Sequence, residues 1–174
     1  MDNEPQPETL TLDLAIEFAT RKFKEAGLEN HFPRVLTVLQ DEFHITDTDI
    51  LIAAILHDTL EDTNTTREEL EETFSKNIAD LVDEVSHPKD YNHAQKIEYY
   101  QKLNTISPKA KVIKLADFAD NLRNMIKERK GNLESPYHNQ YILWIRDFLE
   151  NCPDSSAKST VFELTKELEK YVTE

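Results

Sequence analysis

The 174-residue chain contains only two glycines, Gly27 and Gly131, and a single cysteine, Cys152. It also lacks the alternating runs of valine, isoleucine and threonine, bounded by turn residues, that are typical of β-strands. One cysteine excludes an internal disulfide and a metal site built from thiolates. Both glycines stand where an apolar periodic stretch ends, as glycines that terminate helices do. These absences together predict an all-α protein.

Positive charge and long apolar runs are scarce as well. Twenty Lys and Arg residues face 34 Asp and Glu residues, so the formal net charge is -14. This charge opposes nonspecific attraction to nucleic acid and to anionic lipid. No apolar run approaches the ~20 residues of a membrane span, and the acidic N-terminus is unlike a signal peptide. We therefore expect a cytoplasmic protein with no nucleic-acid or membrane partner, and the sequence leaves its oligomeric state open.

The length of the chain is that of one domain. Residues 1–9 are polar, contain two prolines and are predicted to form a tail, whereas residues 10–174 are predicted to form a single domain. Apolar residues that recur every three or four positions predict the helices of this domain. The expected segments are 12–26, one beginning near 31, 48–60, 65–87, a short helix through 97–103, 108–127, one opened by Ser135-Pro136 and one opened by Ser155-Ser156.

The most informative feature is the run at residues 56–62, where His57 and Asp58 follow a nearly continuous apolar stretch. A lone histidine on an apolar face is usually a core residue, but an ionised carboxylate beside it is too costly to bury without a partner. Asp117 poses the same problem, because apolar residues flank it on both sides. With His31, these residues form a mixed nitrogen and oxygen set that suits a divalent transition metal better than calcium or structural zinc.

Two further acids, Glu61 and Asp62, follow the proposed ligands. On a helix they lie four residues from His57 and Asp58, so they face the same neighbourhood. Metal-assisted hydrolysis needs a carboxylate that orients the metal-bound water or takes its proton. The alternative is that these acids form a solvated cap before the helix that Thr65 opens.

The remaining histidines and most nearby cations are expected at the surface. The other histidines, which lie in polar or boundary contexts, are His44, His87, His93 and His138. The basic residues closest in sequence to the proposed ligands are Lys22, Lys24, Arg34, Lys109, Lys111, Lys114 and Arg123. We expect most of these cations in solvent, although an acidic protein that binds a polyphosphate must place some of them at its site.

At these residues the chain resembles the HD superfamily of metal-dependent phosphohydrolases. It is most similar to the hydrolase domain of RelA/SpoT homologues and to the small stand-alone alarmone hydrolases of the metazoan SpoT-homologue type. The resemblance covers residues from about 12 to 150. The matching stretches are 30–31, 53–63, 81–85, 107–117 and 121–123, with a weaker match at Tyr141 and Trp144.

The resemblance implies a compact multi-helix HD-domain fold and a nucleotide substrate. Family members remove pyrophosphate from the 3′ position of guanosine tetra- or pentaphosphate. The metal implied is manganese, with Fe²⁺ or another divalent metal as an alternative, and its ligands would be His31, His57, Asp58 and Asp117. Glu61 and Asp62 would be the catalytic acids near the attacking water. The substrate contacts implied for the nucleoside and the phosphates are Asn121, Arg21, Lys22, Lys24, Lys96 and Arg123.

The chain departs from the family pattern before His31. Family members usually carry a longer basic loop there, whereas this chain has only residues 23–29. The segment after Val85 is also poor in basic residues, and Lys96 is its best remaining candidate for a phosphate contact. The hypothesis is therefore an alarmone pyrophosphohydrolase. The alternatives are a phosphomonoesterase acting on a nucleoside monophosphate or a dinucleotide 2′-phosphate, and a noncatalytic nucleotide-binding sensor.

Overall fold

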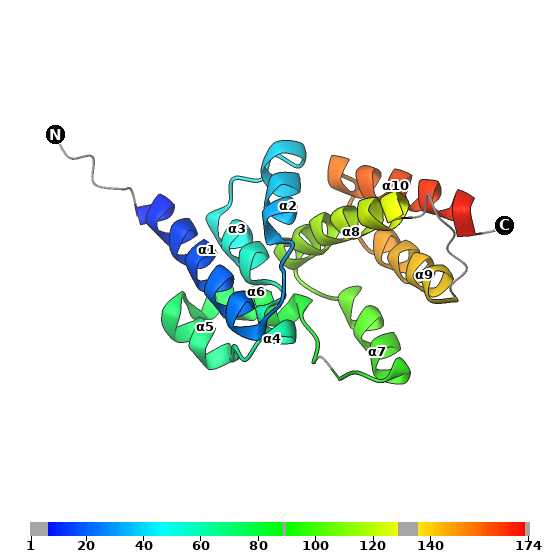
Figure 1. Cartoon of the computed structure of the whole chain (residues 1–174). Coiled ribbons are helices and arrows are strands. Elements are labelled where there is room, and N and C mark those ends of the chain that lie inside the picture. Colours follow the sequence, from blue (N-terminus) through cyan, green and yellow to red (C-terminus); the bar gives the residue numbers. More distant parts are fainter. Residues whose placement is uncertain (1–6, 89, 129–135, 173–174) are drawn as a thin grey trace. The chain divides into compact units, whose positions relative to one another are not determined.

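The computed structural model describes residues 7–88, 90–128 and 136–172, and every regular element in these ranges is a helix (Figure 1). The all-α prediction is confirmed. The chain divides into two compact units, residues 1–91 and 92–174. The prediction of a single domain over residues 10–174 stays a prediction. Among the described residues, none of the helices combines the length and the apolar character needed to cross a bilayer.

The first unit is built around one buried helix. Its elements are α1 (Pro7–Ala26), α2 (Phe32–Thr37), the π-helix η1 (Val38–Glu42), α3 (Thr48–Leu56), α4 (Thr59–Asp62), α5 (Arg67–Thr73) and α6 (Lys76–Val85). Helices α1, α2 and α6 pack against α3 (Figure 1). Residues 50–56 of α3 are all buried, as their continuous apolar sequence predicts.

Helix α1 ends where the sequence predicts but begins earlier. It starts at Pro7, so residues 7–9 of the expected tail are helical, and residues 1–6 lie outside the described part of the chain. Gly27 terminates the helix with a φ of 68°, a conformation that strains residues with a side chain. The Gly27 and Leu28 N–H groups donate to the carbonyls of Lys24 and Phe23, which is a Schellman cap.

The helix predicted for residues 48–60 ends instead at Leu56, and α4 begins at Thr59. Hydroxyl groups satisfy the carbonyls at the break: Thr59 Oγ1 donates to Leu56 O at 2.7 Å, and Ser86 Oγ donates to His57 O at 2.8 Å. His57 and Asp58 therefore occupy a turn between two helices. One helical turn still separates Asp58 from Asp62, because the Asp62 N–H donates to Asp58 O at 2.9 Å.

The helix predicted for residues 65–87 is also interrupted. Its N-cap is Thr66, the residue after the Thr65 that the sequence predicts to open it, and the Thr66 hydroxyl accepts the Glu69 N–H at 3.1 Å. The break follows Thr73, because Ser75 is extended and its hydroxyl accepts the Ile78 N–H at 3.2 Å. A second N-cap inside the apolar pattern thus divides it into α5 and α6.

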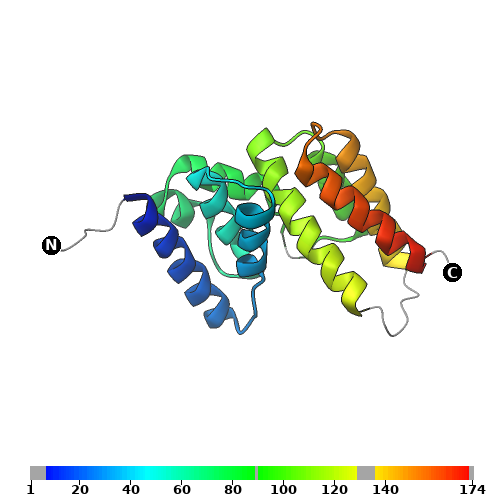
Figure 2. The same ribbon diagram turned by 90° about the horizontal axis from the view of Figure 1, so that it is seen from above.

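The second unit contains α7 (His93–Leu103), α8 (Pro108–Glu128), α9 (Pro136–Glu150) and α10 (Ser156–Val172). Helix α10 packs against α8 and α9 (Figure 2), and α7 packs against α9. The Ser107 and Ser155 hydroxyls accept the N–H groups of Ala110 and Lys158 and so cap α8 and α10, the second as predicted. The predicted helix signals at Gly131 and Ser135 lie outside the described residues.

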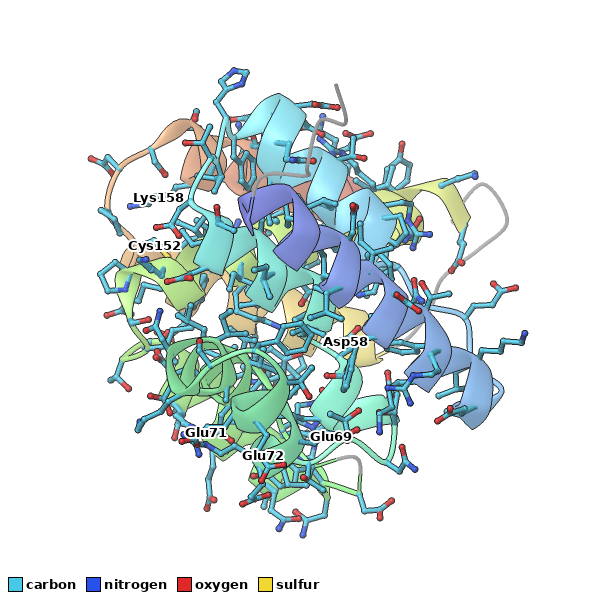
Figure 3. The ribbon with its side chains drawn as sticks, turned by 90° about the vertical axis from the view of Figure 1, so that its left-hand side faces the viewer. Asp58, Glu69, Glu71, Glu72, Cys152 and Lys158 are labelled. Atoms are coloured by element: carbon cyan, nitrogen blue, oxygen red, sulfur yellow. The ribbon has the colours of Figure 1, made fainter. Side chains whose placement is uncertain are left out.

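Aromatic side chains form the core of the second unit. The Phe118 ring lies edge-on to Phe148, with centroids 5.4 Å apart, and the Tyr100 ring stacks on Trp144 at 4.1 Å. Cys152 is buried after α9, and the Lys158 ammonium donates to its carbonyl oxygen at 2.9 Å (Figure 3). The buried position agrees with a structural role for the cysteine.

Candidate metal centre and active site

His57 lies at the C-terminus of α3 and is only 2% exposed. Its Nδ1 is 2.7 Å from the carbonyl oxygen of Ala54. Because a carbonyl can only accept, Nδ1 carries the proton and donates it. Nε2 is therefore the nitrogen that offers a lone pair whenever the ring is neutral, and this is the tautomer that a metal ligand requires.

His31 reaches the same place from the start of α2. Its carbonyl oxygen accepts the N–H groups of Arg34 and Val35 at 3.0 and 3.2 Å, so the first turn of the helix anchors its backbone. Its Nε2 lies 3.1 Å from Nε2 of His57, and the two rings meet edge to face. Two potential nitrogen ligands from separate helices therefore point at the same spot.

Asp58 supplies an oxygen to the same spot from the turn after α3, where Figure 3 labels it. Its Oδ2 is 2.9 Å from Nε2 of His31, and its Oδ1 is 3.1 Å from Nε2 of His57. Burial by itself would raise the pKa of the Asp58 carboxyl. When the imidazoles are protonated, the charge of His57 and the hydrogen bonds from both histidines instead hold that pKa well below its ordinary value, so the carboxylate is ionised.

These three side chains fit a divalent metal by the chemistry of their donor atoms. One ligand atom from each of His31, His57 and Asp58 lies within 4.8 Å of the others. Two imidazole nitrogens and a carboxylate oxygen suit a transition metal of borderline softness. The structure thus brings three of the four predicted ligands together, whereas their role as ligands stays a prediction.

Asp117, the fourth predicted ligand, belongs to the second unit and lies in the middle of α8. It is 4% exposed. Its Oδ2 accepts the Lys114 ammonium at 2.6 Å, and its Oδ1 accepts Nδ2 of Asn121 at 2.8 Å. Each carboxylate oxygen has two lone pairs, so these two bonds orient the carboxylate without excluding a metal.

Lys114 departs from the expectation that most of the nearby cations are in solvent, because it is 7% exposed. Burial alone would lower the pKa of its ammonium. The charge of Asp117 opposes that effect and raises the pKa well above its ordinary value, with smaller contributions from the Tyr99 and Tyr100 hydroxyls. Lys114 therefore stays charged and neutralises Asp117.

The two proposed catalytic acids lie on α4 and are partly buried. Oε1 of Glu61 is 3.2 Å from Nε2 of His87. The interpretation of His87 as an ordinary surface histidine is wrong, because its side chain is only 13% exposed and pairs with this acid. Nothing in the local sequence signals the contact, since His87 follows the end of an apolar helix and meets Glu61 only in three dimensions.

The cations expected on the first helix take different positions. Arg21 is exposed and pairs with Glu25 at 3.6 Å, and Lys24 is exposed. Lys22 is buried, and its ammonium donates to Oε2 of Glu69 at 2.7 Å. The charge of Lys22 is therefore already matched by a carboxylate within the unit.

The remaining expected substrate contacts belong to the second unit. Lys96 on α7 and Arg123 on α8 are both partly buried. Arg123 lines a cavity of about 640 Å³ between α8 and α10. Asn121, as the partner of Asp117, shares the stripe of α8 on which that carboxylate lies.

A family model described as "HD domain" matches residues 12–138 of the chain. The chain belongs to the HD domain family. The match includes parts of both units and all four predicted ligands. This HD domain therefore carries the adjacent His57 and Asp58 within the matched segment.

Several relatives of this HD domain are named for an enzymatic activity. It is 33% identical over 135 residues to the guanosine-3′,5′-bis(diphosphate) 3′-pyrophosphohydrolase MESH1 of Drosophila melanogaster, covering 77% of this chain and 75% of the relative. It is 41% identical over 120 residues to MESH1 of Mus musculus, covering 64% and 67%. A solved structure of a metazoan SpoT orthologue that hydrolyses ppGpp superimposes with a TM-score of 0.78 at 26% identity, covering 95% of this chain and 97% of the other.

Proposed function

We propose that this HD-domain protein is a metal-dependent hydrolase that removes pyrophosphate from the 3′ position of guanosine 3′,5′-bis(diphosphate)-like alarmones. The observation that carries the proposal is the cluster of His31, His57 and Asp58, whose ligand atoms lie within 4.8 Å of one another. The similarity to the MESH1 hydrolases supports the choice of substrate. A nucleotide substrate also agrees with the cytoplasmic location expected from the sequence.

The proposed metal is manganese, with Fe²⁺ or another divalent ion as the alternative, since a mixed nitrogen and oxygen set does not discriminate between them. His31, His57, Asp58 and Asp117 would hold it. When bound, such an ion lowers the pKa of a coordinated water and withdraws charge from a phosphoryl oxygen. Ala54 and Lys114 have supporting roles, because they orient His57 and Asp117.

The acids of α4 are proposed to act on the water. Glu61 or Asp62 takes a proton from the water while the water oxygen bonds to the phosphorus atom attached to the 3′ oxygen, from the side opposite that oxygen. The bond from phosphorus to the 3′ oxygen breaks, the 3′ oxygen takes up a proton, and pyrophosphate leaves intact. The backbone bond from Asp62 to Asp58 at 2.9 Å supports this role, because it ties the acids to the ligand turn.

Asn121 is the proposed contact to the nucleoside, and basic side chains are the proposed contacts to the phosphates. Asn121 already donates one N–H to Asp117, and its second N–H and its carbonyl oxygen can bond a nucleoside. Arg21, Lys24, Lys96 and Arg123 are proposed to face phosphate groups. Lys22 would join them only at the expense of its 2.7 Å ion pair with Glu69, so we propose the weakest phosphate contact for it.

A panel of nucleotides incubated with added manganese tests the proposal. We expect hydrolysis of 3′-pyrophosphorylated purine nucleotides, release of intact pyrophosphate, and a modest preference for guanine over adenine. The preference should be modest because the short segment 23–29 leaves the nucleoside more open on one side. Binding without any turnover would instead support a nucleotide sensor.

The second candidate function is a phosphomonoesterase that uses the same metal. Its motivation is the short segment 23–29, which replaces the longer basic loop of the family. The products discriminate between the two. Release of orthophosphate alone, from a nucleoside monophosphate or a dinucleotide 2′-phosphate, would favour this candidate over the alarmone hydrolase.

A further inference from the structure

His87 makes two directional contacts with its two ring nitrogens. Nδ1 is 2.8 Å from the carbonyl oxygen of Pro88, and Nε2 is 3.2 Å from Oε1 of Glu61. The ring also stacks on Tyr91, with centroids 5.2 Å apart and planes 11° from parallel. All of these groups belong to the first unit. Pro88 and Glu61 contact the two ring nitrogens and Tyr91 covers one face of the ring, so together they fix the orientation of the imidazole.

The contacts define where protons must lie. The carbonyl of Pro88 can only accept, so Nδ1 of His87 donates to it. Nε2 then faces a carboxylate oxygen, which also accepts when it is ionised. One proton must therefore lie between Nε2 and Oε1 of Glu61, because two bare acceptors would repel each other at 3.2 Å.

The backbone beside His87 is tied to the turn that carries the cluster. The Ser86 hydroxyl lies 2.8 Å from the carbonyl oxygen of His57 and 2.7 Å from that of Val82. The segment after α6 is therefore connected to the turn after α3 by a side chain next to His87. A displacement of this segment would move the imidazole relative to Glu61.

We infer that His87 is a positioning residue for Glu61. It binds Oε1 of the carboxylate, so that Oε2 is the oxygen presented to the attacking water. The inference rests on the proposed function, in which Glu61 acts on that water. Glutamate has three rotatable bonds, and an imidazole fixed by Pro88 and Tyr91 removes much of that freedom before substrate binds.

The first test is a comparison of kcat, KM and metal content for the manganese-loaded protein and two variants. His87→Ala should lower kcat by about 10- to 100-fold, because misplacing a reacting group costs rates of this order. KM and metal content should stay at wild-type values. His87→Gln should recover much of kcat, because its amide can still donate to Glu61. A rise in KM with unchanged kcat would overturn the inference and assign His87 to substrate binding.

The second test asks whether His87 acts through Glu61. In a Glu61→Gln background, adding His87→Ala should lower kcat by little more, whereas independent effects would multiply. The matched control is His93→Ala, which removes an exposed histidine at the start of α7 and should leave kcat unchanged. Multiplicative losses in the double variant would contradict the positioning role.

A third variant tests the inference even if the His87→Ala protein does not fold. Tyr91→Leu keeps the imidazole but removes the ring on which it stacks, and should lower kcat by a smaller factor with unchanged metal content. Wild-type kcat in both His87→Ala and Tyr91→Leu would overturn the inference alone. Absence of alarmone hydrolysis by the wild-type protein would overturn the proposed function, and this inference with it.

Discussion

In the first unit, Nε2 of His31 lies 3.1 Å from Nε2 of His57. The Ala54 carbonyl accepts a hydrogen bond from Nδ1 of His57, so the neutral form of the His57 ring presents its Nε2 lone pair toward His31. Two nitrogen lone pairs at this distance repel unless a proton or a cation lies between them. The adjacent Asp58 carboxylate adds negative charge, which favours a cation at this position.

The first prediction concerns metal retention. Asp58→Ala should abolish both bound metal and turnover, because it removes the carboxylate that lies against His31 and His57, while circular dichroism stays helical. Metal analysis after exhaustive dialysis provides the measurement. Asp41→Ala, which removes an exposed acid of η1, is the control and should retain the metal. Wild-type metal content in Asp58→Ala would refute the assignment of the ligands.

The second prediction separates the acids from the ligands. Glu61→Gln and Asp62→Asn should each retain the metal but lower kcat, because these side chains act on the water. A general acid or base contributes ~10²- to 10⁴-fold, and the more important acid should show a loss in this range. Steady-state kinetics and metal analysis on the same preparations provide the measurements. Unchanged turnover in both variants would show that these acids form only a solvated cap before the next helix.

The third prediction concerns the buried ion pair on α8. Lys114→Met should lower the free energy of unfolding by about 3–5 kcal/mol, because it leaves the Asp117 carboxylate buried without its cation. Chemical denaturation measures the loss, and adding Asp117→Asn should recover part of it. Lys127→Met, at an exposed position of the same helix, should change stability by less than ~0.5 kcal/mol.

The pH dependence of this pair follows from the raised pKa of Lys114. The contribution is fully present below the ordinary lysine pKa of about 10.4. It is lost as the pH rises through the higher pKa of the folded state. The stability difference between wild type and Lys114→Met should therefore be constant near neutral pH and shrink only in strongly alkaline solution. A difference that disappears near neutrality would contradict the ion pair.

The fourth prediction concerns Cys152, whose side chain is buried after α9. Burial raises the pKa of the Cys152 thiol, with a smaller opposing effect from Lys111 and Lys158. Because the thiolate is the reactive form, alkylation near pH 8 should be much slower in the folded protein than in denaturant. Mass spectrometry over time measures both rates. Equal rates would show that the thiol is accessible and unperturbed.

Several helices could be predicted closely because their signals are local. Ser107 and the periodic apolar residues that follow define α8, and Gly27 defines the end of α1. The turn at His57 and Asp58 could not be predicted in this way. Its position involves the Ser86 hydroxyl, which is 29 residues away from the His57 carbonyl that it bonds.

The same distinction applies to the charged side chains. Lys114 and Asp117 are three residues apart on one helix, a spacing at which opposite charges meet, so their contact was open to prediction. Lys22 and Glu69 are 47 residues apart. Their ion pair depends on how α1 lies relative to α5, and no local pattern of the sequence indicates it.

The sequence by itself determined the all-helical class, the adjacent His57 and Asp58, and a donor chemistry suited to a divalent metal, because composition and short-range spacing are properties of the chain alone. Only the tertiary structure decided that the His31 ring meets His57, that Lys22 is neutralised by Glu69, and that His87 binds Glu61. These contacts join residues on different elements of the first unit. Their distances follow from the packing of buried helix faces, where side chains far apart in the sequence are forced together.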